Sequence, residues 1–305
     1  MVKEDPKPVQ VDEDRPTEEP RISVVVPMRD AVATLGAQFA ALANQSYEGA
    51  WELIVADNGS TDGSRQLAEE WLGRIPGMKI VDASDRRGPS SARNAGAAAA
   101  KGRLLAFCDT DDVVDQGWLD ALIAALETHD FVVGSMDDTS LNRGLPASWF
   151  DLRSHPTDPT ATSNFLPYAR GCNLAISREA FLAVGGFDDE LTHGEDKDFS
   201  WRVQAAGYPL HFAPDAVVSY RRRRNAKSIW RQYVGFGRSD VLLYRRFREA
   251  GLPRSSWMKA LRAYATLIVT APKLLVHQRR GPWVRAAAIR WGRIVCSIRE
   301  RTLYL

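Results

Sequence analysis

Short apolar runs alternate with helical stretches along residues 21–220, and this alternation constrains the fold more than any other feature of the chain. The β-branched run at residues 22–26 is typical of a buried strand, and the alanine- and leucine-rich residues 31–43 are typical of a helix. Further strands are expected at residues 51–56, 78–81, 104–108, 131–133, 172–176 and 216–220. Further helices are expected at residues 62–72, 89–100, 116–126, 178–184 and 195–206. The pattern predicts an α/β fold in which helices cover both faces of a mostly parallel sheet.

The periodicity stops between residues 136 and 168, where Pro, Ser, Thr, Asn and Asp predominate. A connection of this length inside a compact domain usually serves a function. We therefore expect these residues to form a loop that lines a substrate site.

Charge divides the chain into three parts. Residues 1–20 carry 3 basic and 7 acidic side chains with four prolines, which predicts a disordered acidic tail. The body, residues 21–219, has a net charge of −12, whereas residues 220–305 have 21 basic and 3 acidic side chains, a net charge of +18. We therefore predict a tail at residues 1–20, a folded α/β domain at 21–220 and a basic helical extension at 221–305. Such an extension favours a polyanionic partner, for example an anionic membrane surface.

The cysteines and the N-terminus bear on the compartment. Cys108, Cys172 and Cys296 are widely spaced and indicate neither a zinc site nor a disulfide framework. The N-terminus lacks the basic start and apolar run of a signal peptide, and no apolar window is long enough to span a bilayer. A reducing cytoplasmic location is expected, including a peripheral one on the inner face of the plasma membrane.

Acidic residues follow two of the predicted strands. Asp57 ends the second strand, and Asp109, Asp111 and Asp112 end the fourth. In open α/β sheets ligands bind beyond the carboxyl ends of the strands. Three carboxylates within four residues repel each other unless a cation neutralises them, and oxygen ligands select Mg²⁺ or Mn²⁺. The alternative is a polar turn in which Asp111 or Asp112 caps the next helix, and spacing alone does not decide between them.

A second acidic cluster, Glu195-Asp196-Lys197-Asp198, begins a predicted helix. Acids at a helix N-terminus also complement the helix dipole, so each one has a structural explanation. A carboxylate placed opposite a metal could instead accept the proton of an acceptor hydroxyl.

Together these segments resemble a family-2 glycosyltransferase with the GT-A fold, a Rossmann-like fold, of the bacterial type that acts on cell-surface or lipid-linked glycans. The resemblance covers about residues 21–220 and joins six segments in the family's order. They are Val24-Val25-Val26-Pro27, the run from Asp57 to Ser64, the run from Gly88 to Gly96, Asp109-Thr110-Asp111-Asp112, Gly185-Gly186-Phe187-Asp188 and Glu195-Asp196-Lys197-Asp198. The resemblance implies transfer of a sugar from a nucleotide-sugar donor to a hydroxyl of a glycan or lipid-linked glycan.

The resemblance also assigns residues to the donor. Asp57 would accept a hydrogen bond from the nucleobase, which Pro27 and Arg29 would frame. Arg93 would lie near the base and diphosphate, and Asn173 near the donor sugar.

For catalysis the resemblance implies that Asp109 faces the ribose and the metal, and that Asp111 ligates the metal. Asp196 matches the general base, with Glu195 shaping the acceptor side. A base poised for direct displacement implies inversion at the anomeric carbon.

Two departures from the family pattern concern charge and metal ligation. Asn58 replaces a second acid that is common after Asp57, which lowers the local charge. Ser219 occupies the region of the last strand where the family often has a histidine ligand. His193 is a possible substitute, although a loop histidine is more often simply solvated.

The basic extension leaves two interpretations open. Residues 264–276 are apolar but too short to span a membrane, and Pro272 interrupts them. Residues 283–298 combine apolar residues at helical spacing with arginines, which suits a helix lying in an anionic membrane interface. Alternatively, these helices pack on the body and their arginines face its acids. No nucleic-acid partner is expected, because no recognition module is evident.

Two other functions share some of these features. A sugar nucleotidylyltransferase has a similar α/β pattern but needs a glycine-rich loop with a lysine after the first strand, where this chain has Pro27-Met28-Arg29-Asp30. A non-catalytic membrane-surface scaffold would use the basic extension alone. A dehydrogenase is disfavoured because no GxGxxG follows a strand.

Overall fold

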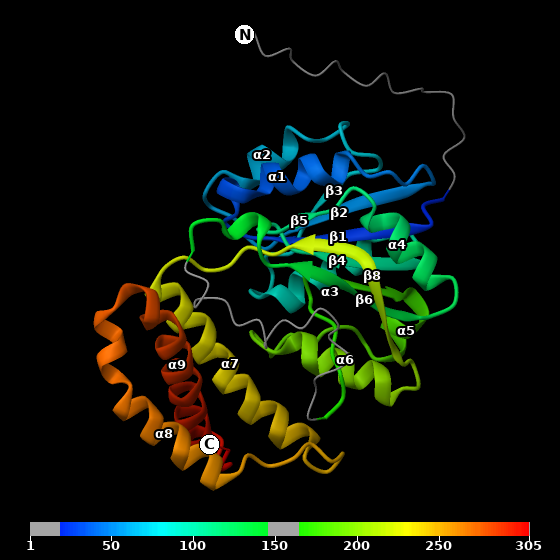
Figure 1. Cartoon of the computed structure of the whole chain (residues 1–305). Coiled ribbons are helices and arrows are strands. Elements are labelled where there is room, and N and C mark those ends of the chain that lie inside the picture. Colours follow the sequence, from blue (N-terminus) through cyan, green and yellow to red (C-terminus); the bar gives the residue numbers. More distant parts are fainter. Residues whose placement is uncertain (1–18, 146–164, 305) are drawn as a thin grey trace, which may run out of the picture.

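The computed structural model describes residues 19–145 and 165–304, which form an eight-stranded sheet flanked by helices and a helical extension (Figure 1). The predicted tail lies outside the described residues except for its last two, and so does most of the predicted loop at residues 136–168. The strands are β1 (Ile22–Met28), β2 (Trp51–Asp57), β3 (Lys79–Asp82), β4 (Leu104–Cys108), β5 (Val113–Val114), β6 (Phe131–Asp137), β7 (Asn173–Ser177) and β8 (Leu210–Ser219).

The sheet has the order β3-β2-β1-β4-β7-β6-β8-β5. Its first four strands are parallel, as the alternation predicted. β7 is antiparallel to both β4 and β6, and β5 is antiparallel to β8, so the sheet is mixed. An apolar run carries no signal for strand direction, which is why the antiparallel pairs were not visible in the sequence.

Helices cover both faces of the sheet because the strands are apolar on both sides. Val24 of β1 packs in the cluster that includes Leu35 and Trp118, whereas Val25 packs on the opposite face with Phe107 and Phe199. Successive strand side chains point to opposite faces, so one apolar run supplies two cores. The helices of the body are α1 (Val32–Ala43), α2 (Ser64–Glu69), α3 (Pro89–Ala99), α4 (Trp118–Leu126), α5 (Arg178–Ala183) and α6 (Glu195–Ala205), with a 3₁₀ turn η1 (Ser140–Asn142).

The extension is helical, as predicted. It comprises α7 (Ala226–Phe247), α8 (Trp257–Val269), the 3₁₀ segment η3 (Ala271–Leu275) and α9 (His277–Arg299). α7 and α9 cross closely at two glycines. A Cβ atom on Gly237 would lie 2.0 Å from the Ile289 carbonyl oxygen, and one on Gly292 would lie 2.2 Å from that of Val234. Glycine is therefore required at this crossing.

α7 fastens the extension to the body. Arg246 contacts Asp188 at 2.6 Å and the buried Asp198 at 2.5 Å. Beside these ion pairs the Trp201 and Phe247 rings are 5.1 Å apart. The packing interpretation of the extension therefore applies to α7.

The segment predicted to lie in a membrane interface, residues 283–298, belongs to α9. Its Val284, Ala288 and Cys296 are buried, and Val284 packs with Ile229 of α7. These buried residues of α9 are used in packing, whereas its Trp291 is 53% exposed. The packing interpretation therefore applies to part of the segment, and the interfacial interpretation stays a prediction for the rest. Within the described parts of the chain, no helix is long and apolar enough to cross a membrane.

Candidate active site

A cavity of about 540 Å³ opens beyond the carboxyl ends of β1, β4 and β8. The loop after β1, the N-terminal turn of α3 and the start of α6 complete its wall. The lining residues are Pro27, Met28, Arg29, Asp30, Ala31, Ala33, Thr34, Asn58, Gly88, Pro89, Ala92, Arg93, Asp109, Thr110, Asp111, Glu195, Arg221 and Arg223. Acidic and basic side chains therefore face each other across one cavity.

Asp109 and Asp111 lie in the turn after β4, and each contacts an arginine. Asp109 accepts a hydrogen bond from Arg93 at 2.8 Å, and Asp111 accepts one from Arg223 at 3.0 Å. Burial raises the pKa of Asp111, and the charge of Asp109 raises it further. The turn thus holds more negative charge than its surroundings offset, which favours a cation.

Asp112 lies beneath this turn and is almost fully buried. Its Oδ1 accepts a hydrogen bond from the Arg221 backbone N–H at 2.8 Å, and its Oδ2 has no hydrogen-bond partner among the described residues. The alternative in which Asp111 or Asp112 caps α4 is wrong, because the N-cap is Gly117 and no side chain caps that helix.

Asp109, Asp112 and Cys172 offer ligand atoms that lie within 4.8 Å of one another. Burial, followed by the nearby Asp112 and Asp109 charges, raises the pKa of the Cys172 thiol well above its usual range. Metals bind the thiolate, so Cys172 is a poor ligand here. The carboxylate oxygens of the turn remain, and they fit a hard divalent cation such as Mg²⁺ or Mn²⁺.

Arg93 connects the two acidic clusters of the cavity. Its guanidinium donates to Asp109 at 2.8 Å and to Glu195 at 3.1 Å. It lies against Gly171, where a Cβ atom would approach its Cζ to 2.8 Å, and over the Phe187 ring. Arg93 thus lies in the cavity wall, and its place beside the diphosphate stays a prediction.

Glu195 and Asp196 begin α6, but only Glu195 lines the cavity. Burial and then the charge of Asp196 raise the pKa of Glu195 to about 7. Asp196 Oδ1 accepts a hydrogen bond from the Lys197 backbone N–H at 2.8 Å. Asp198 is buried between Arg202 and Arg246, so the last acid of the cluster has a structural role.

On the predicted nucleobase side, Pro27 and Arg29 line the cavity, whereas Asp57 does not. Asp57 is buried and accepts a hydrogen bond from the Ser60 backbone N–H at 3.0 Å. Asn58 lines the cavity and accepts a hydrogen bond from the Gly88 N–H at 2.9 Å. The asparagine that replaces an acid thus fixes the loop that leads into α3.

Two predicted residues lie away from the cavity. The Asn173 amide is fully buried, accepts from Trp118 at 2.8 Å and donates to the Ser135 and Ala216 carbonyls at 2.7 and 2.9 Å. Its side chain therefore stabilises the sheet and does not face a donor. His193 lies next to Phe236 of α7 and lines a different cavity, so it is not gathered with the acidic turn.

Two arginines of the cavity were not predicted as site residues. Arg221 donates from Nε to the Asp111 carbonyl oxygen at 2.8 Å, and Arg223 pairs with the Asp111 carboxylate. The signal was present as four consecutive arginines, Arg221 to Arg224, directly after the last strand. Its positive charge places that run in the predicted basic extension.

Comparison with known proteins gives consistent results. The family model described as Glycosyl transferase family 2 matches residues 23–185. The chain is 28% identical to the glycosyltransferase AglE of Haloferax volcanii over 226 residues, which is 73% of this chain and 74% of AglE. It is 26% identical to the pre-mycofactocin glycosyltransferase of Mycobacterium tuberculosis over 242 residues, which is 76% of this chain and 49% of that protein.

Among solved structures, the mannosyltransferase PcManGT from Pyrobaculum calidifontis, in complex with GDP-Man and Mn²⁺, is similar in fold. The TM-score is 0.64 at 19% identity, and the match covers 95% of this chain and 90% of PcManGT.

Proposed function

Because this chain belongs to glycosyl transferase family 2 and has the GT-A fold, we propose that it is an inverting, metal-assisted enzyme that transfers a sugar to a hydroxyl of a glycan or lipid-linked glycan. Glycosyltransfer from a nucleotide sugar is the activity of the family. Membership in this family favours glycosyltransfer over the two alternative functions, a sugar nucleotidylyltransferase and a non-catalytic membrane-surface scaffold. The observation that carries the finer proposal is the cavity in which Arg93 joins Asp109 to Glu195 while Arg221 and Arg223 flank Asp111.

We propose that the donor diphosphate lies between the acidic turn and these arginines. Asp109 and Asp111 would hold Mg²⁺ or Mn²⁺, and the Mn²⁺ in the GDP-Man complex of PcManGT is in keeping with this. A divalent cation supplies positive charge that stabilises the departing nucleoside diphosphate. The guanidinium groups of Arg221 and Arg223 line the same part of the cavity and would bind phosphate oxygens directly. Pro27, Arg29 and Asn58 would contact the nucleoside, with Asp57 supporting that wall from behind.

Asp196 is our proposed general base. Its carboxylate would take the proton of the acceptor hydroxyl as that oxygen attacks the anomeric carbon. The bond from that carbon to the diphosphate oxygen breaks on the opposite side, and the electron pair leaves with the nucleoside diphosphate. Attack opposite the leaving group inverts the configuration. Glu195 faces the cavity and would position the acceptor, and its contact with Arg93 supports this.

The acceptor and the place of action belong to the same proposal. A lipid-linked glycan is presented at a membrane, and the basic extension would bring the enzyme to the inner face of the plasma membrane. Its net charge of +18 over residues 220–305 supports an anionic surface as a partner.

The test uses Asp111→Asn and Asp196→Asn, with Asp130→Asn as a control at an exposed position before β6. A panel of nucleotide sugars with Mn²⁺ or Mg²⁺ is screened for release of nucleoside diphosphate, and circular dichroism checks folding. Loss of a general base should reduce the rate about 10²–10⁴-fold, and Asp130→Asn should leave it unchanged. Chelation of the metal should abolish turnover of the wild type. Full activity of either site variant, or turnover that persists in a chelator, would contradict the mechanism.

A further inference from the structure

α8 and η3 expose a continuous run of apolar side chains. Those on α8 include Trp257 (69% exposed), Leu261 (62%), Ile268 (76%) and Val269 (78%), and Leu275 of η3 is 90% exposed. Residues spaced by four, seven and eight positions lie on one side of a helix, so the four α8 side chains form one face, and the exposed Leu275 follows it on η3. We call this set the α8–η3 face. Soluble monomers rarely expose a large contiguous apolar patch without a partner.

α8 and η3 lie on the outer side of the extension (Figure 1). α9 is between α8 and α7, so α8 is on the side of the extension that is turned away from the catalytic body. Ala260 is the one buried residue of α8 among those described. Helix packing thus uses little of α8 and leaves its apolar face available.

The charge around this face has a single sign. Residues 251–299 contain ten lysines and arginines and no aspartate or glutamate. An apolar face flanked by cations and carrying a tryptophan is typical of a helix that lies in an anionic membrane interface. An acidic protein would match the charge, but it would not need the exposed aliphatic residues at both ends of the face.

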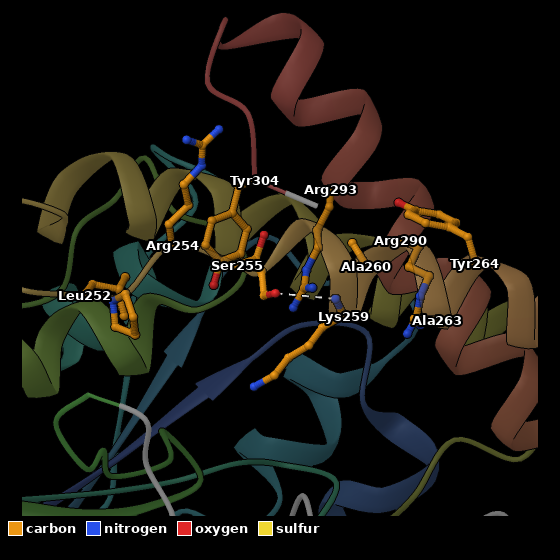
Figure 2. Close-up of a pocket in the computed structure, with 12 residues that line it drawn as sticks. Leu252, Arg254, Ser255, Lys259, Ala260, Ala263, Tyr264, Arg290, Arg293 and Tyr304 are labelled. Carbon is orange, nitrogen blue, oxygen red and sulfur yellow. Dashed lines mark hydrogen bonds between the residues drawn. The ribbon is translucent and has the colours of Figure 1, made fainter.

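A basic pocket lies beside the face, between the turn before α8, α8 itself and α9 (Figure 2). It has a volume of about 500 Å³ and is lined by Arg254, Lys259, Arg290 and Arg293, and none of the described residues in its lining is an aspartate or glutamate. In the described parts of the chain, neither Arg254 nor Lys259 has an acidic partner. The hydroxyl of Tyr264, another lining residue, is buried without a hydrogen-bond partner in these parts.

The cations of this pocket are incompletely compensated. Arg293 pairs with Asp240 of α7 at 2.8 Å, whereas Arg290 lies over the Tyr264 ring and, among the described residues, donates to the Ala286 carbonyl oxygen and has no acidic partner. Burial and then the charge of Arg293 lower the pKa of Arg290. An anion with several acceptor oxygens would relieve this repulsion and could accept from the Tyr264 hydroxyl.

We propose that the α8–η3 face docks the enzyme on an anionic phospholipid bilayer, with the apolar side chains in the boundary between headgroups and acyl chains and a lipid phosphate in the basic pocket. This proposal extends the proposed action on lipid-linked acceptors, but its test needs no donor, acceptor or turnover.

The docking face is linked to the active-site cavity through packed residues. Arg223 lines the cavity and α7 begins three residues later, at Ala226. Ile229 of α7 packs on Val284 of α9, and the neighbouring Trp283 donates to the Leu267 carbonyl oxygen of α8 at 3.0 Å. The end of α8 that continues into η3 is therefore at the same end of the molecule as the cavity.

The test measures binding of the full chain to vesicles of phosphatidylcholine with about a third phosphatidylglycerol, and to phosphatidylcholine alone, by co-sedimentation. The face variant is Val269→Ser with Leu275→Ser, and its control is Leu182→Ser, a leucine on α5 that is 65% exposed. Burying a large aliphatic side chain contributes about 1.5–3 kcal/mol, so the face variant should bind at least about tenfold more weakly. Leu182→Ser should bind like the wild type.

The pocket variant is Arg254→Glu with Lys259→Glu, and its control is Arg248→Glu with Arg299→Glu, which changes the net charge equally outside the pocket. The pocket variant should lose at least about tenfold in binding to the anionic vesicles, and the control clearly less. Inorganic phosphate should raise the melting temperature of the wild type more than that of the pocket variant, which still keeps the arginines of the active-site cavity to bind it.

Three outcomes would overturn the proposal. The first is equal binding of the wild type and the face variant to anionic vesicles. The second is stabilisation of the wild type by inorganic phosphate together with equal vesicle binding of the wild type and the pocket variant. That result would make the pocket a site for a free anion. The third is a face variant that changes the oligomeric state in sedimentation but not vesicle binding, which would make the face a contact between copies. Failure of the catalytic proposal would leave vesicle binding unaffected, so the two are separable.

Discussion

At the scale of single residues, Arg93 connects the two acidic clusters of the cavity through one guanidinium group. Its Nη2 contacts Asp109, its Nη1 contacts Glu195, and the side chain is itself buried. Removing either acid leaves part of a buried charge unpaired, whereas exchanging a carboxylate for an amide keeps a hydrogen-bond acceptor. Amide variants are therefore the better probes of chemistry at this site.

Glu195 should make stability depend on pH. Its pKa rises from an ordinary 4.5 to about 7 in the folded protein, so between these values the folded state holds a proton that the unfolded chain has lost. The stabilising effect of that proton is fully present below about pH 4.5 and is lost as the pH rises through about 7. Urea unfolding of the wild type and Glu195→Gln at several pH values should show the wild type losing stability relative to the variant over this window. A difference that stays constant with pH would contradict the shift.

Arg223 should bind the donor diphosphate. It lines the cavity 3.0 Å from Asp111, whereas Arg224 next to it donates to the Leu141 carbonyl oxygen and does not line the cavity. A hydrogen bond to a charged group contributes about 1.5–3 kcal/mol, so Arg223→Ala should weaken binding of the nucleoside diphosphate about tenfold or more. Isothermal titration calorimetry measures this, with Arg224→Ala as the matched control. Equal dissociation constants for the two variants would assign Arg223 no part in binding.

The sequence predicted most of the charged residues of the cavity, because they follow predicted strands or begin predicted helices. Asn173 was misassigned for a physical reason. The sequence predicts that Asn173 lies at the start of a strand. It does not predict which way the side-chain amide points, because its hydrogen-bond partners Trp118, Ser135 and Ala216 are distant in the sequence. Likewise, Arg221 could not be assigned to the cavity without knowing that Asp112 lies beside it.

At the scale of secondary-structure elements, α7 is held on the body by Arg246. This side chain pairs with Asp188 and with Asp198, whose carboxylate is fully buried. Removing a partner from a buried charge costs about 3 kcal/mol, so Arg246→Ala should lower the free energy of unfolding by a similar amount. The loss is reduced because Arg202 still pairs with Asp198 in the variant. Urea denaturation of Arg246→Ala measures this effect.

Arg245 provides the comparison for that prediction. It pairs with Glu300 at 2.6 Å and is more than half exposed. An exposed ion pair contributes about 0.2–1 kcal/mol, so Arg245→Ala should have a small effect. Equal losses in the two variants would mean that Arg246 is not a specific attachment of α7.

The elements themselves were predictable where an apolar run is long and isolated. β5 has two residues and was missed, and β8 begins six residues before the predicted strand because Pro214 and Asp215 interrupt its apolar pattern. The extension shows a different limit. α8 and α9 both have apolar and basic residues at helical spacing, and only their packing shows that α9 lies on α7 while α8 is left exposed.

At the scale of the whole molecule, the cavity extends across the predicted boundary between body and extension. Arg221 and Arg223 belong by sequence to the basic extension at residues 221–305, yet they line the cavity of the predicted domain at residues 21–220. We therefore propose that the catalytic unit includes the start of the extension. A change in net charge marks where composition shifts, and here it falls within the site.

The separation of charge between the two halves has a consequence for how the molecule approaches a surface. The tail and the body carry net charges of −4 and −12 and the extension +18, so the protein has a large electric dipole moment although its net charge is only +2. Near an anionic surface this dipole experiences a torque that turns the extension toward the lipid and the body away from it. The protein would thus be oriented before first contact, and added salt would slow its capture more than its release.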